Sequence, residues 1–206
     1  MLGLGNSLSN AAVTGGPEIQ DISDMELWLK NGIGITSDGG TPDKVSQWDD
    51  QSGNARHAAQ GDSAKQATLT GGGLDFESGE FDYYDLASNI TIAYRGEFTM
   101  AWVMEAETTS NITVIADGAN EVVQFQNVNK FKFTANNLSG STSNLSSAIY
   151  KGATFAADEK MLLTFTRDGD NDLLLYKNGA VITPHAGLSS NLTNNRGFDL
   201  SQVGAK

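Results

Sequence analysis

Apolar and polar side chains alternate along many short stretches of this chain, and glycine-rich turns separate the stretches. Lys130–Thr134 alternates most cleanly, with phenylalanine at every second position. A period of two predicts β-strands, and helical periodicity is nearly missing. Many short strands at spacings of about 8–12 residues predict a two-sheet antiparallel sandwich. The expected strands are Asp24–Lys30, Leu74–Phe76, Phe98–Met104, Asn111–Ala116, Glu121–Phe125, Lys130–Thr134, Met161–Arg167, Leu173–Lys177 and Ala180–Thr183.

Turn sequences join two pairs of these strands. Asp117–Asn120 is expected to connect one hairpin, and Asn178-Gly179 is the strongest short hairpin signal in the chain. The Phe98–Met104 strand differs from the others because its apolar side chains occupy both parities. That pattern predicts a central strand in a sheet that is covered on both faces.

The N-terminal residues differ from the rest of the chain. Residues 1–22 are mostly small and polar, carry no sustained period and include the breaker Gly15-Gly16-Pro17. We expect them to form an extended arm, and residues 23–206 to form one domain. An arm of this composition needs a neighbouring molecule to hold it, which indicates an assembly.

Composition and charge exclude several classes of function. The 206 residues include 25 acidic and 13 basic side chains and no cysteine, and the formal net charge is -12. Nucleic acid is not expected as a partner, because its phosphates would be repelled. Without cysteine there are no disulfides, thiolate zinc sites or cysteine nucleophiles. No segment approaches the roughly 18 apolar residues of a membrane span, and the first residues lack the basic start of a secretion signal. We therefore expect synthesis in a cytosol and no membrane insertion.

The segment Val45–Asn54 contains Trp48, Asp50, Ser52 and Asn54 in the order W-x-D-x-S-G-N. This order resembles a hallmark of LamG-like domains, which are concanavalin A-like lectin and glucanase domains. Further pieces in the family's order stand at Leu27–Leu29, Phe98–Val103, Leu162–Gly179 and Leu200–Gly204. The resemblance implies an all-β jelly roll of two antiparallel sheets. For these residues we expect structural roles, with Trp48 as a core anchor and the three polar side chains bonded to loop backbone.

The sequence departs from the family at its end. LamG-like domains usually continue past the Leu200–Gly204 strand with one more strand, which pairs beside the Leu27–Leu29 strand. Here the last residue is Lys206. We therefore expect an open sheet edge near Leu27–Leu29, which a partner completes unless the natural chain is longer.

Two groups of closely spaced acids are candidates for chemistry. Asp168, Asp170 and Asp172 would suit a hard, oxygen-ligated cation such as calcium, and the alternative is an acidic β-turn between two strands. Glu105 and Glu107 have the alternate spacing that places two carboxylates on one face of a strand, as in glucanases of this fold. The third acid of the glucanase pattern is missing, which favours a charged strand end instead.

A third candidate site lies in the aromatic stretch Phe81–Asp85. It places three rings beside two acids, and sugars are bound by exposed rings with polar neighbours. Tyr83, Tyr84 and Asp85 are therefore candidate ligand contacts. The alternative is that one or two of the rings pack in the core.

Together these features favour a non-enzymatic function. The chain resembles small virion proteins of tailed bacteriophages in four features. These are the arm, the absence of cysteine, the absence of a secretion signal and the Asn/Thr/Gly-rich β content. LamG-like domains occur there in tail, fibre and capsid-surface proteins. The resemblance implies a virion structural protein that contacts other virion proteins through residues 1–22, within an oligomer or lattice. The alternatives are a carbohydrate-binding adhesin module for host glycans and, less favoured, a glycoside hydrolase.

Overall fold

The computed structural model describes residues 19–77, 79–107, 112–117, 121–127, 130–135, 146–151, 155–170, 172–182 and 197–204, so residues 1–18 of the expected arm lie outside the described part. Within these ranges the chain is all-β, with two short 3₁₀ helices at Ile19–Asp21 and Ser63–Lys65. The strands are β1 (Ile35–Ser37), β2 (Val45–Trp48), β3 (Ala58–Ala59), β4 (Thr68–Thr70), β5 (Gly73–Asp75), β6 (Tyr83–Ile92), β7 (Phe98–Glu105), β8 (Ile112–Ala116), β9 (Val122–Asn127), β10 (Lys130–Ala135), β11 (Ser146–Lys151), β12 (Lys160–Arg167), β13 (Leu173–Lys177), β14 (Ala180–Ile182) and β15 (Phe198–Gly204).

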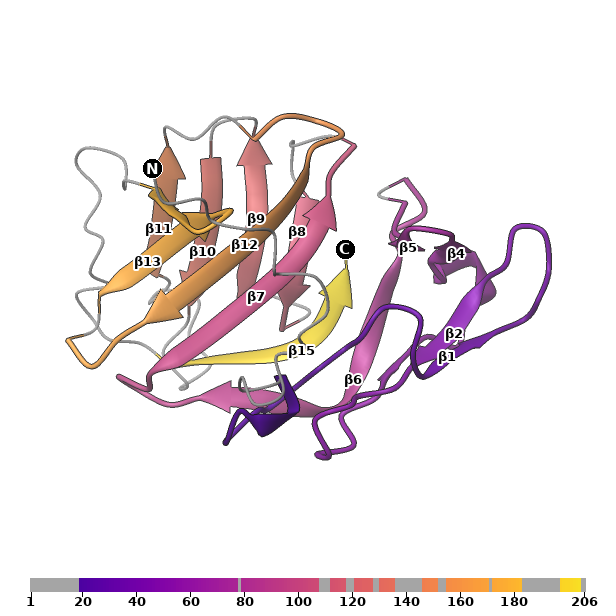
Figure 1. Ribbon diagram of the computed structural model, residues 1–206, viewed down its shortest axis with the longest axis horizontal. Coiled ribbons are helices and arrows are strands. Elements are labelled where there is room, and N and C mark those ends of the chain that lie inside the picture. The colour runs from indigo at the N-terminus through magenta and orange to yellow at the C-terminus, as the bar shows by residue number, and fades with distance from the viewer. Residues whose placement is uncertain are drawn as a thin grey trace, which may run out of the picture.

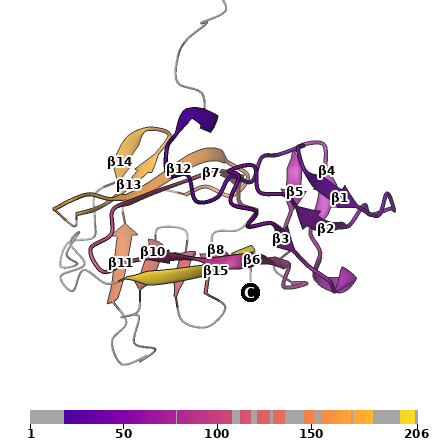
Figure 2. The same cartoon turned by 90° about the horizontal axis from the view of Figure 1, so that it is seen from below.

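The described strands form two large sheets and one small one. The larger sheet has nine strands in the order β1-β2-β3-β6-β15-β8-β9-β10-β11, and the second has four in the order β14-β13-β12-β7. Strands β4 and β5 form a two-stranded sheet. Figure 1 shows the four-stranded sheet in front of β8–β11, and the turned view of Figure 2 shows the two sheets as separate layers. The paired strands in these sheets run antiparallel, which gives the β-sandwich that the alternation predicts.

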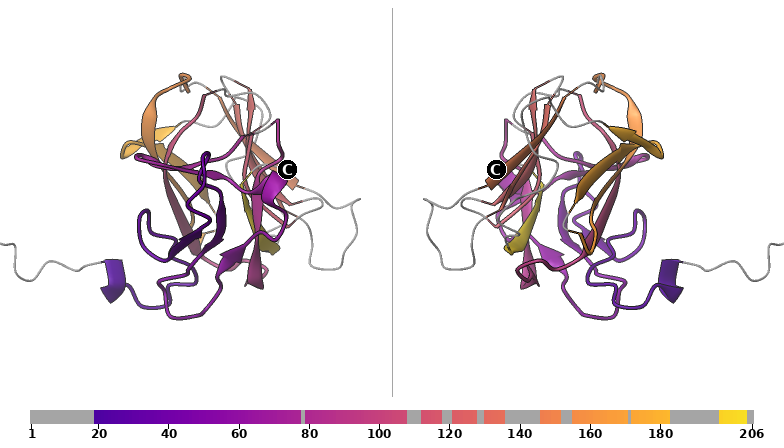
Figure 3. Two further views of the ribbon diagram at one scale, coloured as in Figure 1. Left: turned by 90° about the vertical axis from the view of Figure 1, so that its right-hand side faces the viewer. Right: turned by 90° about the vertical axis from the view of Figure 1, so that its left-hand side faces the viewer.

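Phenylalanine rings from both sheets meet in the core. Phe98 and Phe165 come from the four-stranded sheet, whereas Phe133 and Phe198 come from the nine-stranded sheet. Their ring centroids lie 4.9 to 6.2 Å apart in tilted and edge-to-face pairs. Such pairs add roughly 0.5–1.5 kcal/mol each beyond burial. The rings therefore hold together the two layers that are seen end-on in Figure 3.

Both predicted hairpins are confirmed. Strand β8 pairs antiparallel with β9, and β13 pairs with β14. In the second turn Asn178 and Gly179 have φ values of 51° and 80°, as a tight hairpin turn requires. The Asn178 Oδ1 atom also accepts the backbone N–H of Leu162 at 2.9 Å, so this turn helps to position β12.

Strand β7 is an edge strand, so its prediction as a covered central strand is wrong. It pairs with β12 on one side and with no other described strand. Its residues alternate between half-buried and exposed along the whole strand, and Val103 is 75% exposed. The sequence pattern was misleading because Ala101 and Val103 are apolar side chains on the outer face of the sheet.

The expected strand over Asp24–Lys30 is reduced to one isolated bridge, between Leu29 and Asp50. Side chains of the following loop hydrogen-bond to the backbone groups that a neighbouring strand would need for pairing. For example, Asn54 Nδ2 donates to the carbonyl of Met25 at 2.7 Å. The strand prediction is therefore wrong for this segment.

The open sheet edge is also in a different place from the one expected. Leu27–Leu29 lies outside all three sheets, and the described edges of the two large sheets are β1, β11, β14 and β7. The long, exposed edge is that of β7.

The loop around Asp50 has the structural role that was expected of it. Asp50 Oδ1 accepts the N–H groups of Trp28 and Ser52, each at 2.9 Å. Its Oδ2 accepts the N–H of Arg56 at 3.0 Å and the Ser52 hydroxyl at 2.8 Å. Burial raises the pKa of Asp50, but these hydrogen bonds to the carboxylate outweigh it and the pKa is lowered. Trp48 is partly buried against the core.

Candidate functional site

A cluster of three carboxylates lies where the β5–β6 connection meets the end of β7. Asp75 ends β5, Glu77 follows it in the connection, and Glu107 follows β7. One ligand oxygen from each of the three lies within 4.8 Å of the others. The negative charge of Asp75, followed by that of Glu107, raises the pKa of Glu77. Among the described residues, these three form the group that could hold a hard cation, because oxygen ligands at this spacing suit calcium.

Asp82 is a buried acid next to this cluster. Its Oδ2 atom accepts the N–H of Glu77 at 2.9 Å, whereas its Oδ1 atom is buried without a partner in the described part of the chain. Burial is the largest cause of the raised pKa of Asp82. Lys44 is the nearby cation, and its Nζ atom lies 3.0 Å from Glu80 Oε2. The β5–β6 connection thus carries several acids, Glu107 joins them from the end of β7, and the ion-paired Lys44 lies nearby.

Sequence reasoning missed this cluster because Glu107 is far from Asp75 and Glu77 in the chain. The signal that points toward it is the alternate spacing of Glu105 and Glu107, for which the sequence favours a charged strand end over a catalytic pair. The structure separates those two acids. Glu107 joins the cluster, and Glu105 lies on the outer face of β7 in register with Lys160.

The predicted calcium ligands Asp168, Asp170 and Asp172 form a turn. Asp168 Oδ1 accepts the N–H of Asp170 at 3.0 Å and that of Asp172 at 2.9 Å. Among the described residues these three carboxylates do not form a group with ligand oxygens within 4.8 Å of one another. The arrangement matches the alternative, an acidic β-turn between β12 and β13, which an aspartate stabilises by accepting nearby backbone N–H groups.

The predicted sugar contacts Tyr83, Tyr84 and Asp85 begin β6. Tyr84 is fully buried, and its hydroxyl accepts the N–H of Ala67 and donates to the carbonyl of Val45. Burial raises the pKa of Tyr84. Tyr84 is thus a core residue with no surface to offer a ligand, as the alternative interpretation allowed. Tyr83 is half-buried and Asp85 is exposed, so a ligand role for these two stays a prediction.

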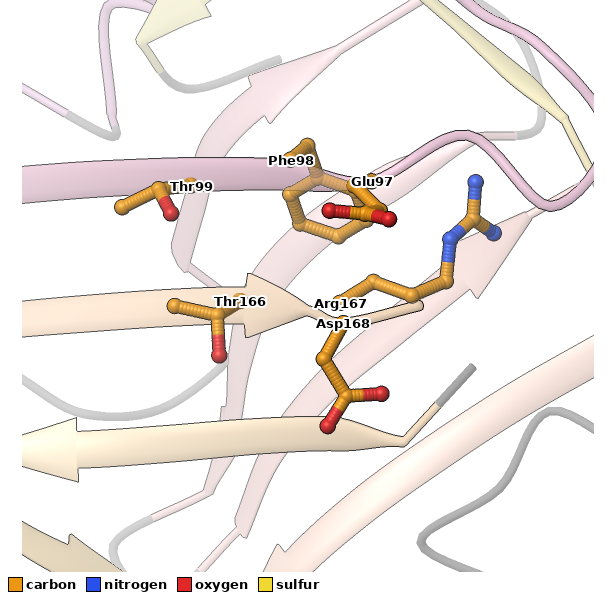
Figure 4. Close-up of a pocket in the computed structure, with 6 residues that line it drawn as sticks. All are labelled: Glu97, Phe98, Thr99, Thr166, Arg167 and Asp168. Atoms are coloured by element: carbon orange, nitrogen blue, oxygen red, sulfur yellow. The ribbon is translucent and has the colours of Figure 1, made fainter. Parts of the chain in front are cut away.

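A pocket of about 360 Å³ opens where β7 begins and β12 ends. Figure 4 shows its lining, which is Glu97, Phe98, Thr99, Thr166, Arg167 and Asp168. The guanidinium of Arg167 points away from Asp168 and donates to the carbonyls of Gly96 and Ala93 at 2.7 and 3.1 Å. Its carbon Cζ lies 5.3 Å from the Phe98 ring centroid. Arg167 therefore joins the end of β12 to the turn before β7. The N–H groups that donate these two hydrogen bonds have a structural role.

The outer face of the four-stranded sheet carries several exposed apolar side chains. Val103 is 75% exposed, Val181 59% and Leu162 41%, on β7, β14 and β12 respectively. Among the described residues on this face, Glu105 is the acid and Lys160 the base, and they stand opposite each other across β7 and β12. Val103 and Leu162 lie opposite each other across β7 and β12, and exposed apolar patches of folded proteins often mark interaction sites. We name this surface the outer face.

Comparison with protein-family models, curated proteins and solved structures gives no match for this chain. Across the described part of the chain, no helix has the length and apolar content needed to span a membrane.

Proposed function

We propose that this protein is a non-enzymatic structural component of a bacteriophage virion, in the tail, a fibre or the capsid surface. Its sandwich is a LamG-like jelly roll that presents an interaction surface, and residues 1–22 form an arm that anchors it to a neighbouring virion protein. The W-x-D-x-S-G-N resemblance supports the LamG-like assignment, because Asp50 holds its loop by the backbone hydrogen bonds expected of it.

The observation that carries the proposal is the outer face together with its free edge at β7. Exposed apolar surface on a sheet costs solubility unless a partner covers it. The chain has a net charge of -12, so charged side chains are common in it. The exposed position at the sheet edge is nevertheless filled by the apolar Val103, which is 75% exposed. Such a surface suits a protein whose role is to pack against neighbours in an assembly.

The test is to look for the chain in virions. Particles of the phage that encodes the chain are purified, the chain is quantified by mass spectrometry, and it is located by immunogold electron microscopy. We expect a fixed copy number per particle and label at one place on it. Purified particles that lack the chain would overturn the proposal.

A carbohydrate-binding adhesin module is the second candidate function. It is favoured by Phe81, which is 59% exposed, and by the half-buried Tyr83 near it on the same loop-to-strand segment. A glycan array probed with the purified chain tests it, with Tyr83→Ala and Asp85→Ala as the variants expected to lose binding. An array without hits removes this candidate, and hydrolysis of a bound glycan that Glu107→Gln abolishes would favour a glycoside hydrolase.

A further inference from the structure

We propose that two copies of this chain pair antiparallel through their β7 strands, which joins two four-stranded sheets into one of eight strands. The inference deepens the proposed structural role and rests on it, because it names the partner of the free edge of β7.

The backbone of β7 has hydrogen-bonding groups free at its edge. Leu162 exchanges backbone and side-chain hydrogen bonds with Asn178, so its N–H and C=O point away from β7. Since Val103 stands opposite Leu162, its own N–H and C=O point away from β12. The same holds at every second residue, so Thr99, Ala101, Val103 and Glu105 direct their backbone groups outward. No other described strand pairs with them. An unpaired row of this length is a template for another strand.

The side chains of β7 favour one register for a second copy. A two-fold axis requires that residue i faces residue j and that j faces i. With the axis at Val103, the two Val103 side chains meet and each Glu105 faces an Ala101 of the other copy. An axis at Trp102 would instead place each Val103 opposite an Ala101, and an axis at Ala101 would place Glu105 opposite Glu97. The register centred on Val103 therefore brings the most exposed apolar side chains of the two copies into contact and avoids facing carboxylates.

Charge permits a second copy to approach at this edge. Two chains that each carry a net charge of -12 repel each other over most of their surfaces. The outer face is the exception among the described surfaces discussed above, because Glu105 is matched by Lys160 in register. Two copies can therefore approach most closely there, and salt should strengthen the pairing by screening the repulsion elsewhere.

A cysteine substitution tests the register directly, because the chain has no cysteine of its own. Val103→Cys is expected to form a disulfide-linked dimer under mild oxidation. Facing residues of a hydrogen-bonded antiparallel pair have Cα atoms about 5.5 Å apart, which lies within the roughly 4.4–6.8 Å span of disulfides. Val181→Cys is the matched control, because it is exposed on the same face at the opposite edge, and it is expected to stay unlinked.

Analytical ultracentrifugation of the full chain tests the pairing itself. Wild type is expected to dimerise, more strongly at high salt. Val103→Glu and Val103→Lys are each expected to weaken the dimer roughly tenfold or more by opposing like charges, and an equimolar mixture of the two is expected to restore it. Ala101→Pro removes an outward N–H and should also weaken the dimer, while Val181→Glu should not. Circular dichroism of each variant verifies that it is folded.

A wild-type chain that stays monomeric up to its solubility limit overturns the inference, and so does a dimer that Val103→Glu and Ala101→Pro leave intact. The outcomes also separate the inference from the proposed function. A monomeric chain found in virions contradicts only the pairing through β7. A dimeric chain that is missing from virions contradicts only the structural role.

Discussion

Asp50 and Asp82 are two buried acids whose protonation behaves in opposite ways. Both carboxylates lose water on folding, and this loss by itself would raise the pKa of each. Asp50 accepts four hydrogen bonds and its pKa is lowered in spite of burial. Within the described part of the chain, Asp82 accepts one hydrogen bond, from the N–H of Glu77, and its pKa is raised. The number of donors aimed at the carboxylate decides which effect wins.

Asp50→Asn is expected to lower the free energy of unfolding at pH 7 by about 1–3 kcal/mol, because it removes a charged acceptor that several N–H groups share. A lowered pKa in the fold stabilises the protein above the unfolded value near 4, and this stabilisation is lost as the pH falls through the folded value. The difference in the free energy of unfolding between wild type and the Asp50→Asn variant should therefore narrow below about pH 4. Urea unfolding at pH 7 and pH 3 measures it, and an equal loss at both would contradict this account.

Asp82→Asn is expected to keep or raise the free energy of unfolding at pH 7. The amide oxygen can still accept the N–H of Glu77, while the buried charge is gone. A raised pKa in the fold means that wild type loses stability as the pH rises from the unfolded value near 4 through the folded value. The advantage of the variant should thus be present at pH 7 and absent at pH 4. A variant less stable than wild type at pH 7 would show that the charge itself is needed.

At the scale of elements, the β15 strand shows how closely its neighbours pack. It lies between β6 and β8 in the nine-stranded sheet. Its last residue, Gly204, has φ of 102°, and a Cβ atom there would lie 2.6 Å from the Phe76 ring and 2.8 Å from the carbonyl of Asp82. The glycine therefore lets β15 end against the loop that carries the acidic cluster.

Gly204→Ala is expected to lower the free energy of unfolding by about 2–4 kcal/mol, from overpacking together with an unfavourable positive φ. Gly179→Ala is the matched control, since its φ is 80° and no neighbouring atom lies within 4 Å of the added Cβ. The free energy of unfolding of the control should fall only by the cost of a positive φ at a residue with a Cβ atom, about 1 kcal/mol. Chemical unfolding of both variants measures the difference, and equal losses would mean that the close contact with Phe76 is relieved at no cost.

At the scale of the whole molecule, negative charge opposes folding. The net charge is -12, and Asp75, Glu77 and Glu107 gather in one cluster. Like charges destabilise a compact state, and salt screens them over about 10 Å at 0.1 M. The stability of this protein should therefore depend on ionic strength.

We expect the unfolding midpoint to rise with sodium chloride, and Glu77→Gln to be more stable than wild type at low salt. The variant removes the acid whose pKa the cluster raises most clearly, so its advantage should shrink at high salt and vanish when the pH is lowered enough to protonate Glu77. Thermal unfolding at low and high salt checks this. Glu26→Gln is the control, because Glu26 is ion-paired with Arg56 and its loss should not stabilise the protein. A salt-independent midpoint would contradict the argument.

Much of the fold was predictable from local signals. The alternation in Lys130–Thr134 and the Asn178-Gly179 turn correctly indicated a strand and a hairpin, because side-chain period and positive φ depend only on neighbouring residues. The role of the Asp50 loop was also predictable from its motif. The acidic cluster was not, because Glu107 reaches Asp75 only after β6 and β7 have paired elsewhere.

The sequence alone determined that the chain is all-β, where most strands lie and which loop Asp50 holds. The tertiary structure alone decided which strand is an edge and which acids meet. In Phe98–Glu105 the apolar pattern indicated a covered strand, yet Val103 faces outward at a free edge. The physical reason is that strand pairing joins residues far apart in the chain. An apolar side chain on the outer face of a sheet has the same local pattern as one buried under a second layer.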